Sequence, residues 1–374
     1  MEGPQKLIGL SIAARMWEQM KTKNFMIMVL FVIATSISIW LLGSPTPHLK
    51  TFVSKTQQKI TDIRNNMKSL PSGPDFSVLD QTYLEQLGFY SGSKIYPNTT
   101  EPNMELPMIA TAVSSSSDSV MLKLNKLLDS VHKYFPSAMV TVFDLHLDPW
   151  DLKTLEKHCN ASTQCIVKTF EFDKYPSIVG TLGNMAYKPI AIQLILKEYG
   201  AVIWADLSEY FLNNNIKNII KIAKTSGLAA WTIKGNYPTT TLTHQKMFSF
   251  FKTKAELYKF HNMIDSDHLI IYNTYRMHKK VMLPWAECAM TEDCISPMGA
   301  QNVGCDFNKK PKYKYSNCHR YATSALNVIL GPVFDYQLVH YKVDDKIFGI
   351  LKESLNSTVK SSSEAKNAGS SRRA

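Results

Sequence analysis

A pair of polar residues follows directly after an unbroken apolar run near the centre of the chain. Asp206 and Ser208 come after the run AVIWA at 201–205. Such a run is typical of a strand buried on both faces of a parallel sheet. Ligands of these sheets bind at the carboxyl ends of the strands, where a carboxylate can hold a divalent cation and, through it, phosphate oxygens. The alternative interpretation is that Asp206 caps a helix that begins near Asn213.

The segment before this run has the features of a helix. Pro189 suits a first helical turn, because the hydrogen bond that proline cannot donate is not needed there. Gly200 would end the helix in a left-handed conformation. Between them, apolar residues recur at helical spacing, namely Ile192, Ile195, Leu196 and Tyr199. We expect Lys188 to be a solvated charge at the start of this helix.

Strand-like and helix-like segments alternate from about residue 105 to 350, which predicts an α/β domain with a mostly parallel sheet and flanking helices. Further strands are predicted at 108–113, 139–143, 166–170, 228–232 and 269–272, and helices at 122–131, 149–158 and 244–263. A literal Asp-x-Asp occurs at Asp265-Ser266-Asp267. Because it precedes the strand at 269–272, we expect it at the opposite edge of the sheet from Asp206, in a loop or cap.

The N-terminal region predicts a membrane anchor. Residues 25–43 carry no charge, and as a helix they would span roughly 28 Å, enough for a bilayer core. We interpret 1–24 as a cytosolic tail, 25–43 as an uncleaved signal-anchor, 44–104 as a stem and 351–374 as a disordered tail. A cleaved signal peptide and a buried soluble helix are the alternatives. A short heptad pattern in the stem leaves open a homodimer through the stem or the transmembrane helix.

The sequons and the cysteines orient this anchor. All lie C-terminal to it: sequons at Asn98, Asn160 and Asn356, and cysteines at 159, 165, 288, 294, 305 and 318. An even number of cysteines on one side suits disulfides in an oxidising lumen. The spacing favours the local pairs Cys159–Cys165, Cys288–Cys294 and Cys305–Cys318, whereas a zinc site would need CxxC pairs that are absent. We therefore expect a single-pass type II protein of the Golgi or endoplasmic reticulum membrane.

Composition and missing motifs exclude several classes of function. The net charge is +11, but the basic residues are spread along the chain without interleaved aromatic residues, so we expect no nucleic-acid partner. The chain contains no G-x-G-x-x-G, no P-loop and no G-x-S-x-G. A sulfotransferase is disfavoured, because the loop at 114–119 lacks a basic residue. Sugar transfer from a nucleotide donor is among the few common functions that remain.

The segment 185–211 resembles the K-P-x-x-I…G-x-V-x-W-x-D-x-S-x-x-F pattern of an uncharacterised metazoan family, a domain of unknown function distantly similar to GT-A glycosyltransferases. Three further stretches are similar to the family's V-Y-D-L-G-L, W-x-x-C-A-L…C-I-x-P and C-H-R-Y-D-Q-S-A-L-N patterns, at 142–147, 285–297 and 318–327. Together they cover roughly residues 105–335. A short anchor, a stem and a lumenal α/β domain are also similar to the organisation of a Golgi glycosyltransferase.

This resemblance implies a GT-A-like domain that moves a sugar from a nucleoside diphosphate donor to a glycan or glycoprotein acceptor. Asp206 and Ser208 then correspond to the metal-binding Asp-x-Asp of such enzymes, with Mn²⁺ or Mg²⁺ as the metal. Asp144 is the candidate contact of the nucleoside. His319 and Arg320 are candidates to contact the diphosphate or the metal, because both offer nitrogen donors. The alternative for His319, which stands beside a cysteine, is a buried, hydrogen-bonded residue.

Departures from the family pattern favour the alternative of a non-catalytic pseudo-glycosyltransferase that binds or scaffolds in the lumen. The second acid of Asp-x-Asp is missing at Ser208. The family's Asp and Gln in H-R-Y-D-Q are Ala322 and Thr323, and the Gly of D-L-G-L is His146. No residue is assigned as catalytic. Trp204 and Trp285 are expected in the core rather than as platforms for a sugar.

Overall fold

The computed structural model describes residues 27, 30–37, 74, 76, 79–97, 106–160 and 165–351. The chain forms two compact units, Met1–Pro71 and Ser72–Ala374. In the first unit the described residues 27 and 30–37 are helical. Most of the predicted anchor, the heptad pattern of the stem and the predicted disordered tail lie outside the described residues.

Among the described residues, no helix combines the length and the apolar character needed to cross a membrane.

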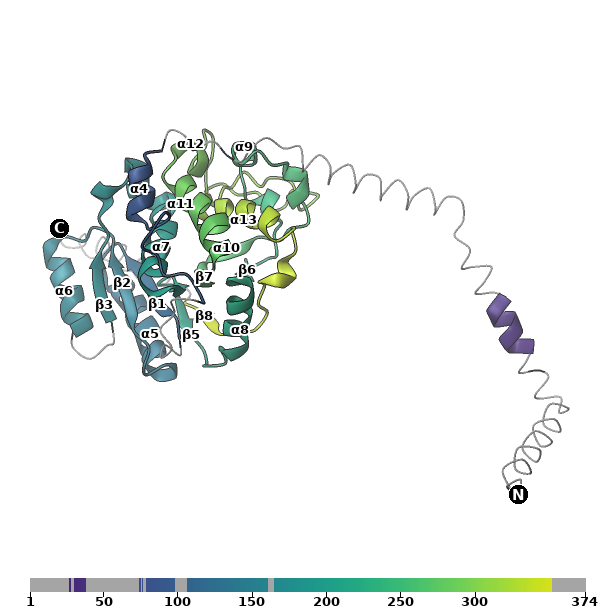
Figure 1. Ribbon diagram of the computed structural model, residues 1–374, viewed down its shortest axis with the longest axis horizontal. Helices are drawn as coiled ribbons and strands as arrows, with labels where there is room; N and C mark the ends of the chain where they lie inside the picture. The colour runs from purple at the N-terminus through teal and green to yellow at the C-terminus, as the bar shows by residue number, and fades with distance from the viewer. Residues whose placement is uncertain are drawn as a thin grey trace, which may run out of the picture. The chain divides into compact units, whose positions relative to one another are not determined.

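The second unit is built on a six-stranded sheet in the order β3-β2-β1-β4-β7-β6 (Figure 1). Strands β1 to β4 are mutually parallel, and β7 runs antiparallel to both of its neighbours. The strands are β1 Met108–Val113, β2 Val140–Asp144, β3 Cys165–Thr169, β4 Ala201–Ala205, β6 Leu228–Thr232 and β7 Ile264–Tyr272. A two-stranded antiparallel sheet joins β5 Glu209–Phe211 to β8 Phe348–Ile350. The predicted α/β class with a mostly parallel sheet is confirmed.

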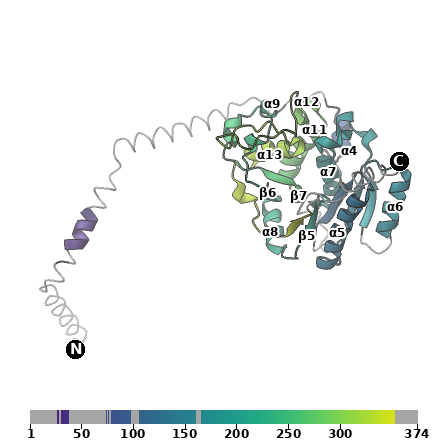
Figure 2. The same cartoon turned by 180° about the vertical axis from the view of Figure 1, so that it is seen from behind.

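Helices cover both faces of the sheet (Figures 1 and 2). One apolar core lies beneath α5 Asp118–Tyr134, α6 Pro149–Asn160 and α8 Lys217–Ser226. The other lies beneath α4 Gln81–Gln86, α7 Tyr187–Tyr199, α11 Leu283–Ala289 and α13 Tyr321–Val333. Shorter helices are α9 Gln245–Phe250, α10 Tyr275–Met277 and α12 Glu292–Ile295, with a π-helical turn at His278–Met282 and 3₁₀ turns at Phe172–Lys174, Ser177–Gly180, Leu182–Asn184, Thr239–Thr241, Ala255–Tyr258 and Leu338–His340.

The central helix and strand form as their sequence predicts. Helix α7 ends at Gly200, which has φ 76°, a conformation that glycine adopts without a steric cost. The chain then reverses into β4, all of whose residues are buried. Because α7 runs back along β4, its first turn lies at the carboxyl edge of that strand. Trp204 and Trp285 have no exposed surface, which confirms that they belong to the core.

Two local predictions are wrong. The single helix expected at 244–263 is interrupted, because α9 ends at Phe250 and Lys252 adopts a left-handed conformation with φ 50°. Asp206 does not cap the next helix, because β5 intervenes and α8 begins only at Lys217. In addition, the compact unit begins before residue 105, since Leu84, Leu87 and Phe89 pack in the core beneath α7.

The three disulfides predicted from local spacing are confirmed. They join Cys159 to Cys165, Cys288 to Cys294 and Cys305 to Cys318. These bonds indicate an oxidising, secretory or lumenal environment. Of the predicted sequons, Asn98 and Asn356 lie outside the described residues, and Asn160 is the last residue of α6.

The turn after β2 contains an unfavourable residue that offers a test of backbone strain. His146 has φ 70° and an exposed side chain. A residue with a Cβ is destabilised by about 1–2 kcal/mol in this left-handed region, and glycine avoids that strain. Because glycine also makes the unfolded chain more flexible, part of the benefit is offset, and His146→Gly should raise the free energy of unfolding by about 0.5–1 kcal/mol. Thermal melts measure this. His146→Ala keeps the Cβ and is the control. Equal stability of the two variants would contradict the strain.

Candidate functional site

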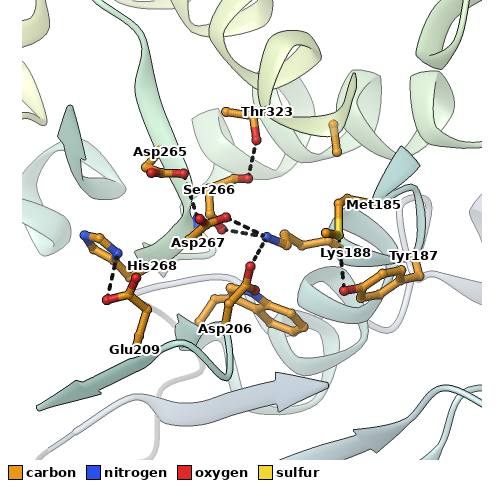
Figure 3. A network of polar contacts seen from close by, with 12 residues as sticks. Met185, Tyr187, Lys188, Asp206, Glu209, Asp265, Ser266, Asp267, His268 and Thr323 are labelled. Carbon is orange, nitrogen blue, oxygen red and sulfur yellow. Dashed lines mark hydrogen bonds and ion pairs between the residues drawn. The ribbon is translucent and has the colours of Figure 1, made fainter. Parts of the chain in front are cut away.

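A buried ammonium lies at the carboxyl edge of β4 (Figure 3). Lys188, in the first turn of α7, is 1% exposed. Its Nζ donates to Asp206 Oδ2 at 2.7 Å, to the carbonyl oxygen of Ser266 at 3.2 Å and to Asp267 Oδ1 at 3.4 Å. The expectation that Lys188 is a solvated charge is therefore wrong. The lysine stem crosses the interface between α7 and the sheet and places its charge among carboxylates.

The direction of β7 brings the literal Asp-x-Asp to this site. Asp206 N donates to the carbonyl oxygen of Asp267 at 2.7 Å, which continues the antiparallel pairing of β4 with β7. The first residues of β7 therefore lie at the edge where β4 ends. The expected position of Asp265-Ser266-Asp267 at the opposite edge is wrong, because that expectation assumed a parallel strand. In the structure β7 already includes Asp265 and Asp267, so the strand begins before the apolar run predicted at 269–272.

Opposing influences set the protonation of this cluster. Burial alone would lower the pKa of Lys188, but the carboxylates of Asp206 and Asp267 outweigh it and raise that pKa above its usual value. Burial raises the pKa of Asp267, but the ammonium of Lys188 holds that pKa below its usual value. Burial raises the pKa of Asp206 to about 7, although Lys188 opposes the rise. The lysine is thus charged and ion-paired at neutral pH.

The side chains around Asp206 do not fit the predicted metal site. Divalent cations such as Mg²⁺ and Mn²⁺ require several oxygen ligands with available lone pairs. Here Asp206 Oδ1 accepts a hydrogen bond from Trp204 Nε1 at 2.6 Å, and Asp206 Oδ2 accepts one from Lys188. In the described part of the chain, no three His, Cys, Asp or Glu side chains are grouped so as to hold a metal ion. The carbonyl oxygen of Ser208 accepts a hydrogen bond from Leu351 N at 2.8 Å.

A second acid–base pair lies beside the first. Glu209 is 2% exposed, and its Oε2 lies 3.7 Å from Nδ1 of His268, which follows Asp267 on β7 (Figure 3). The His268 ring packs against Trp231 and Phe348, with ring centroids 4.9 and 4.8 Å apart. No sequence pattern indicates this pair, because its members come from two strands that only the fold brings together.

The C-terminal segment reaches the same edge through Thr323. Its hydroxyl lies 2.5 Å from the hydroxyl of Ser266, so the start of α13 lies next to the aspartates of β7. Arg320 precedes α13 and has an exposed side chain. The N-terminus of a 13-residue helix favours negative charge, and an exposed guanidinium beside it adds to this preference.

His319 has a structural position rather than the predicted contact with a diphosphate. The ring has no exposed surface. Its Nδ1 accepts from His244 N at 3.2 Å, and its Nε2 lies 3.2 Å from the carbonyl oxygen of Ile295. Both ring nitrogens are therefore engaged by the backbone, which is the arrangement of a neutral imidazole that joins two loops. Burial lowers the pKa of His319 to about 3.

Asp144 lies at the carboxyl edge of the sheet, as its place after a predicted strand implies. It ends β2, is 1% exposed, and its Oδ1 accepts from Leu147 N at 2.7 Å. In the strand order, β2 and β4 flank β1. Asp144 and Asp206 therefore stand on either side of the end of β1, two strand spacings or roughly 10 Å apart. The order of the strands reverses between β1 and β4, and such a switch point is where open α/β sheets bind ligands.

Comparison with known families confirms the resemblance found in the sequence. A family model described as "Protein of unknown function (DUF1647)" matches residues 54–193. The chain has no match among curated proteins.

Several solved structures of glycosyltransferases are similar to the chain. Apo WbbM, a bifunctional glycosyltransferase, is 8% identical with a TM-score of 0.40, over 64% of this chain and 40% of that chain. Mouse xyloside xylosyltransferase 1 in its apo form is 9% identical with a TM-score of 0.37, over 62% of this chain and 82% of that chain. The galactosyltransferase LgtC, in complex with donor and acceptor sugar analogs, is 12% identical with a TM-score of 0.32, over 60% of this chain and 70% of that chain. These TM-scores are below 0.5, so the similarities do not indicate a function for this chain.

Proposed function

We propose that the protein binds a nucleoside diphosphate sugar at the carboxyl edge of its parallel sheet and transfers the sugar to a glycan or glycoprotein. The observation that carries this proposal is the charged cluster of Lys188, Asp206 and Asp267 at the end of β4, beside the switch point between β1 and β4. The carboxyl edge of the sheet at this position suits a nucleotide, because strand ends and helix N-termini supply polar groups there. The GT-A class expected from the sequence is part of this proposal.

Three residues receive roles in this proposal. Asp144 is buried, and through its hydrogen bond with Leu147 N it would hold the turn after β2 against which the nucleoside lies. Arg320, exposed at the start of α13, would neutralise the leaving diphosphate. Asp206 would orient the sugar-bearing phosphate through its hydrogen-bonded partners Lys188 and Trp204. The site has no place for the divalent cation implied by the resemblance, because both carboxylate oxygens of Asp206 accept hydrogen bonds from Lys188 and Trp204.

The proposal is tested by the binding of UDP, GDP and CMP to the purified full-length protein, measured by calorimetry. We expect one nucleoside diphosphate to bind. Arg320→Gln should weaken that binding by about 10- to 100-fold, the cost of one charge-assisted hydrogen bond. Lys221→Gln, which removes an exposed charge from α8, is the matched control and should bind as wild type does. A folded wild type that binds none of these nucleotides would overturn the proposal.

The runner-up is a non-catalytic lumenal binding protein on the same fold. It is favoured by Ala322 and Thr323, which stand where the family pattern has an acid and an amide, and by the use of the Thr323 hydroxyl to contact Ser266. The two functions differ in turnover. A protein that binds the nucleotide sugar and yet leaves it intact in the presence of mixed glycan acceptors would be the binding protein.

We place this activity in the Golgi or endoplasmic reticulum, with the protein as a single-pass type II membrane protein. The three disulfides support an oxidising compartment, and the uncharged run at 25–43 supports the anchor. Protection of the C-terminal region from protease in sealed microsomes tests the orientation. Cleavage of that region without detergent would contradict it.

A further inference from the structure

The ammonium of Lys188 is fully satisfied by its surroundings. Its three hydrogens are matched by three acceptors, which are Asp206 Oδ2, the Ser266 carbonyl oxygen and Asp267 Oδ1. The side chain is 1% exposed, whereas those of Asp206 and Asp267 are 20% and 45% exposed. The cation therefore lies on the inner side of the two carboxylates, and the carboxylates separate it from solvent.

The place that Lys188 occupies has the character of a cation site. Two carboxylates from neighbouring strands, β4 and β7, converge there and would repel each other without a positive charge between them. A backbone carbonyl oxygen, from Ser266, completes the set of acceptors. Carboxylate and carbonyl oxygens are also the ligands that Mg²⁺ and Mn²⁺ prefer. Here the chain itself supplies the positive charge, from the first turn of a buried helix.

A divalent ion would have to displace a group that cannot leave easily. Lys188 has neighbours in the helix that are buried, including Tyr187, Pro189 and Ile190. If the ammonium stayed in place, a divalent ion beside it would meet like charge at short range in a weakly screened environment. If it moved, it would need a new partner inside the core.

We infer that Lys188 occupies the place of a divalent cation between Asp206 and Asp267, so that this site excludes a metal ion and the diphosphate ligand is held by other positive groups. The identity of the ligand rests on the proposed function, whereas the exclusion of the metal does not. Lys188 neutralises one of the two carboxylates. Arg320 and the N-terminus of α13, next to Ser266, meet the remaining charge of the ligand.

The inference is tested first without any nucleotide, by titrating the full-length protein with Mn²⁺ and following the signal of free Mn²⁺ by electron paramagnetic resonance. We expect no site on the wild type that depends on Asp206. Lys188→Met, which removes the ammonium and keeps a similar volume, should gain one such site, and Lys188→Met with Asp206→Asn should lose it again. Mn²⁺ should also raise the Tm of Lys188→Met and leave that of the wild type unchanged.

A wild-type Mn²⁺ site that disappears in Asp206→Asn would overturn the inference, and this arm needs only variants that keep the ammonium. It therefore decides the question even if Lys188→Met does not fold. A folded Lys188→Met that gains no site would also count against it.

Nucleotide binding separates this inference from the proposed function. Binding of the nucleoside diphosphate that is equal in EDTA and in Mn²⁺ supports both. Binding that is lost in EDTA overturns the inference and leaves the proposed function intact. If no nucleotide binds under either condition, the proposed function fails, and the Mn²⁺ titration alone decides whether Lys188 excludes the metal.

Discussion

Lys188→Met is expected to lower the free energy of unfolding by about 3–5 kcal/mol, because removing one partner from a buried ion pair leaves the other without compensation. The methionine fills a similar volume, so a cavity contributes little to this cost. Asp206 and Asp267 are left facing each other, and Asp206 is the less exposed of the two. Urea unfolding at neutral pH measures the effect. Lys157→Met, which replaces an exposed lysine on α6, should remain within about 0.5 kcal/mol of wild type.

A double-mutant cycle separates the ion pair from mere packing. Asp206→Asn alone leaves the ammonium with Asp267 and the Ser266 carbonyl oxygen. Combined with Lys188→Met, it removes both charges, and Asp267 is 45% exposed and can be hydrated. The double variant should therefore be more stable than the sum of the single costs implies, by about 1–3 kcal/mol. Strict additivity would show that Lys188 acts through its stem rather than through its charge.

Local patterns were sufficient to predict the elements that position this site. Helix α7, its end at Gly200 and the strand β4 all follow from short-range rules, namely apolar spacing, a left-handed cap and an unbroken apolar run. The three disulfides also follow from short spacing. Each of these predictions concerns residues that are close in sequence, so that local geometry restricts the outcome.

The composition of the site could not be predicted in the same way, because it depends on the direction of β7. An apolar run reads identically whether a strand is parallel or antiparallel to its neighbour. Only long-range packing placed the start of β7, with Asp265 and Asp267, beside the end of β4. The burial of Lys188 has a related cause. A lysine at the start of an apolar helix is solvated unless acceptors from another strand meet it, and these acceptors lie 78 and 79 residues further along the chain.

His319 illustrates a different limit of sequence reasoning. Its neighbourhood in the C-H-R-Y segment implied a contact with a ligand, and the residue type suits one. The structure instead uses both ring nitrogens to join the loop before α9 to the end of α12, through His244 N and the Ile295 carbonyl oxygen. Residue type alone does not distinguish these roles, because a neutral imidazole is equally suited to a ligand and to two backbone groups. Burial decides, and burial is a property of the fold.

This position of His319 predicts a pH-dependent contribution to stability. Burial lowers the pKa of His319 to about 3 in the folded protein, whereas in the unfolded chain this pKa has its ordinary value of 6.5. Between these two pH values the imidazole is protonated in the unfolded state and neutral in the folded state. The contribution of neutral His319 to the free energy of unfolding is therefore present above pH 6.5 and is lost on acidification. From pH 7.5 to pH 5 the loss is about 2 kcal/mol, since each pH unit below 6.5 costs about 1.4 kcal/mol.

His319→Phe isolates this contribution from the other titrating groups. The variant keeps a ring but loses both hydrogen bonds, so at pH 7.5 it should be less stable than wild type by about 2–4 kcal/mol. Because phenylalanine does not titrate, the difference between the two proteins should shrink by about 2 kcal/mol when urea unfolding is repeated at pH 5. His132→Phe, on the exposed side of α5, is the matched control for the change of residue type. A difference that stays constant from pH 7.5 to pH 5 would mean that His319 titrates in the folded protein as it does in the unfolded chain, which contradicts its burial.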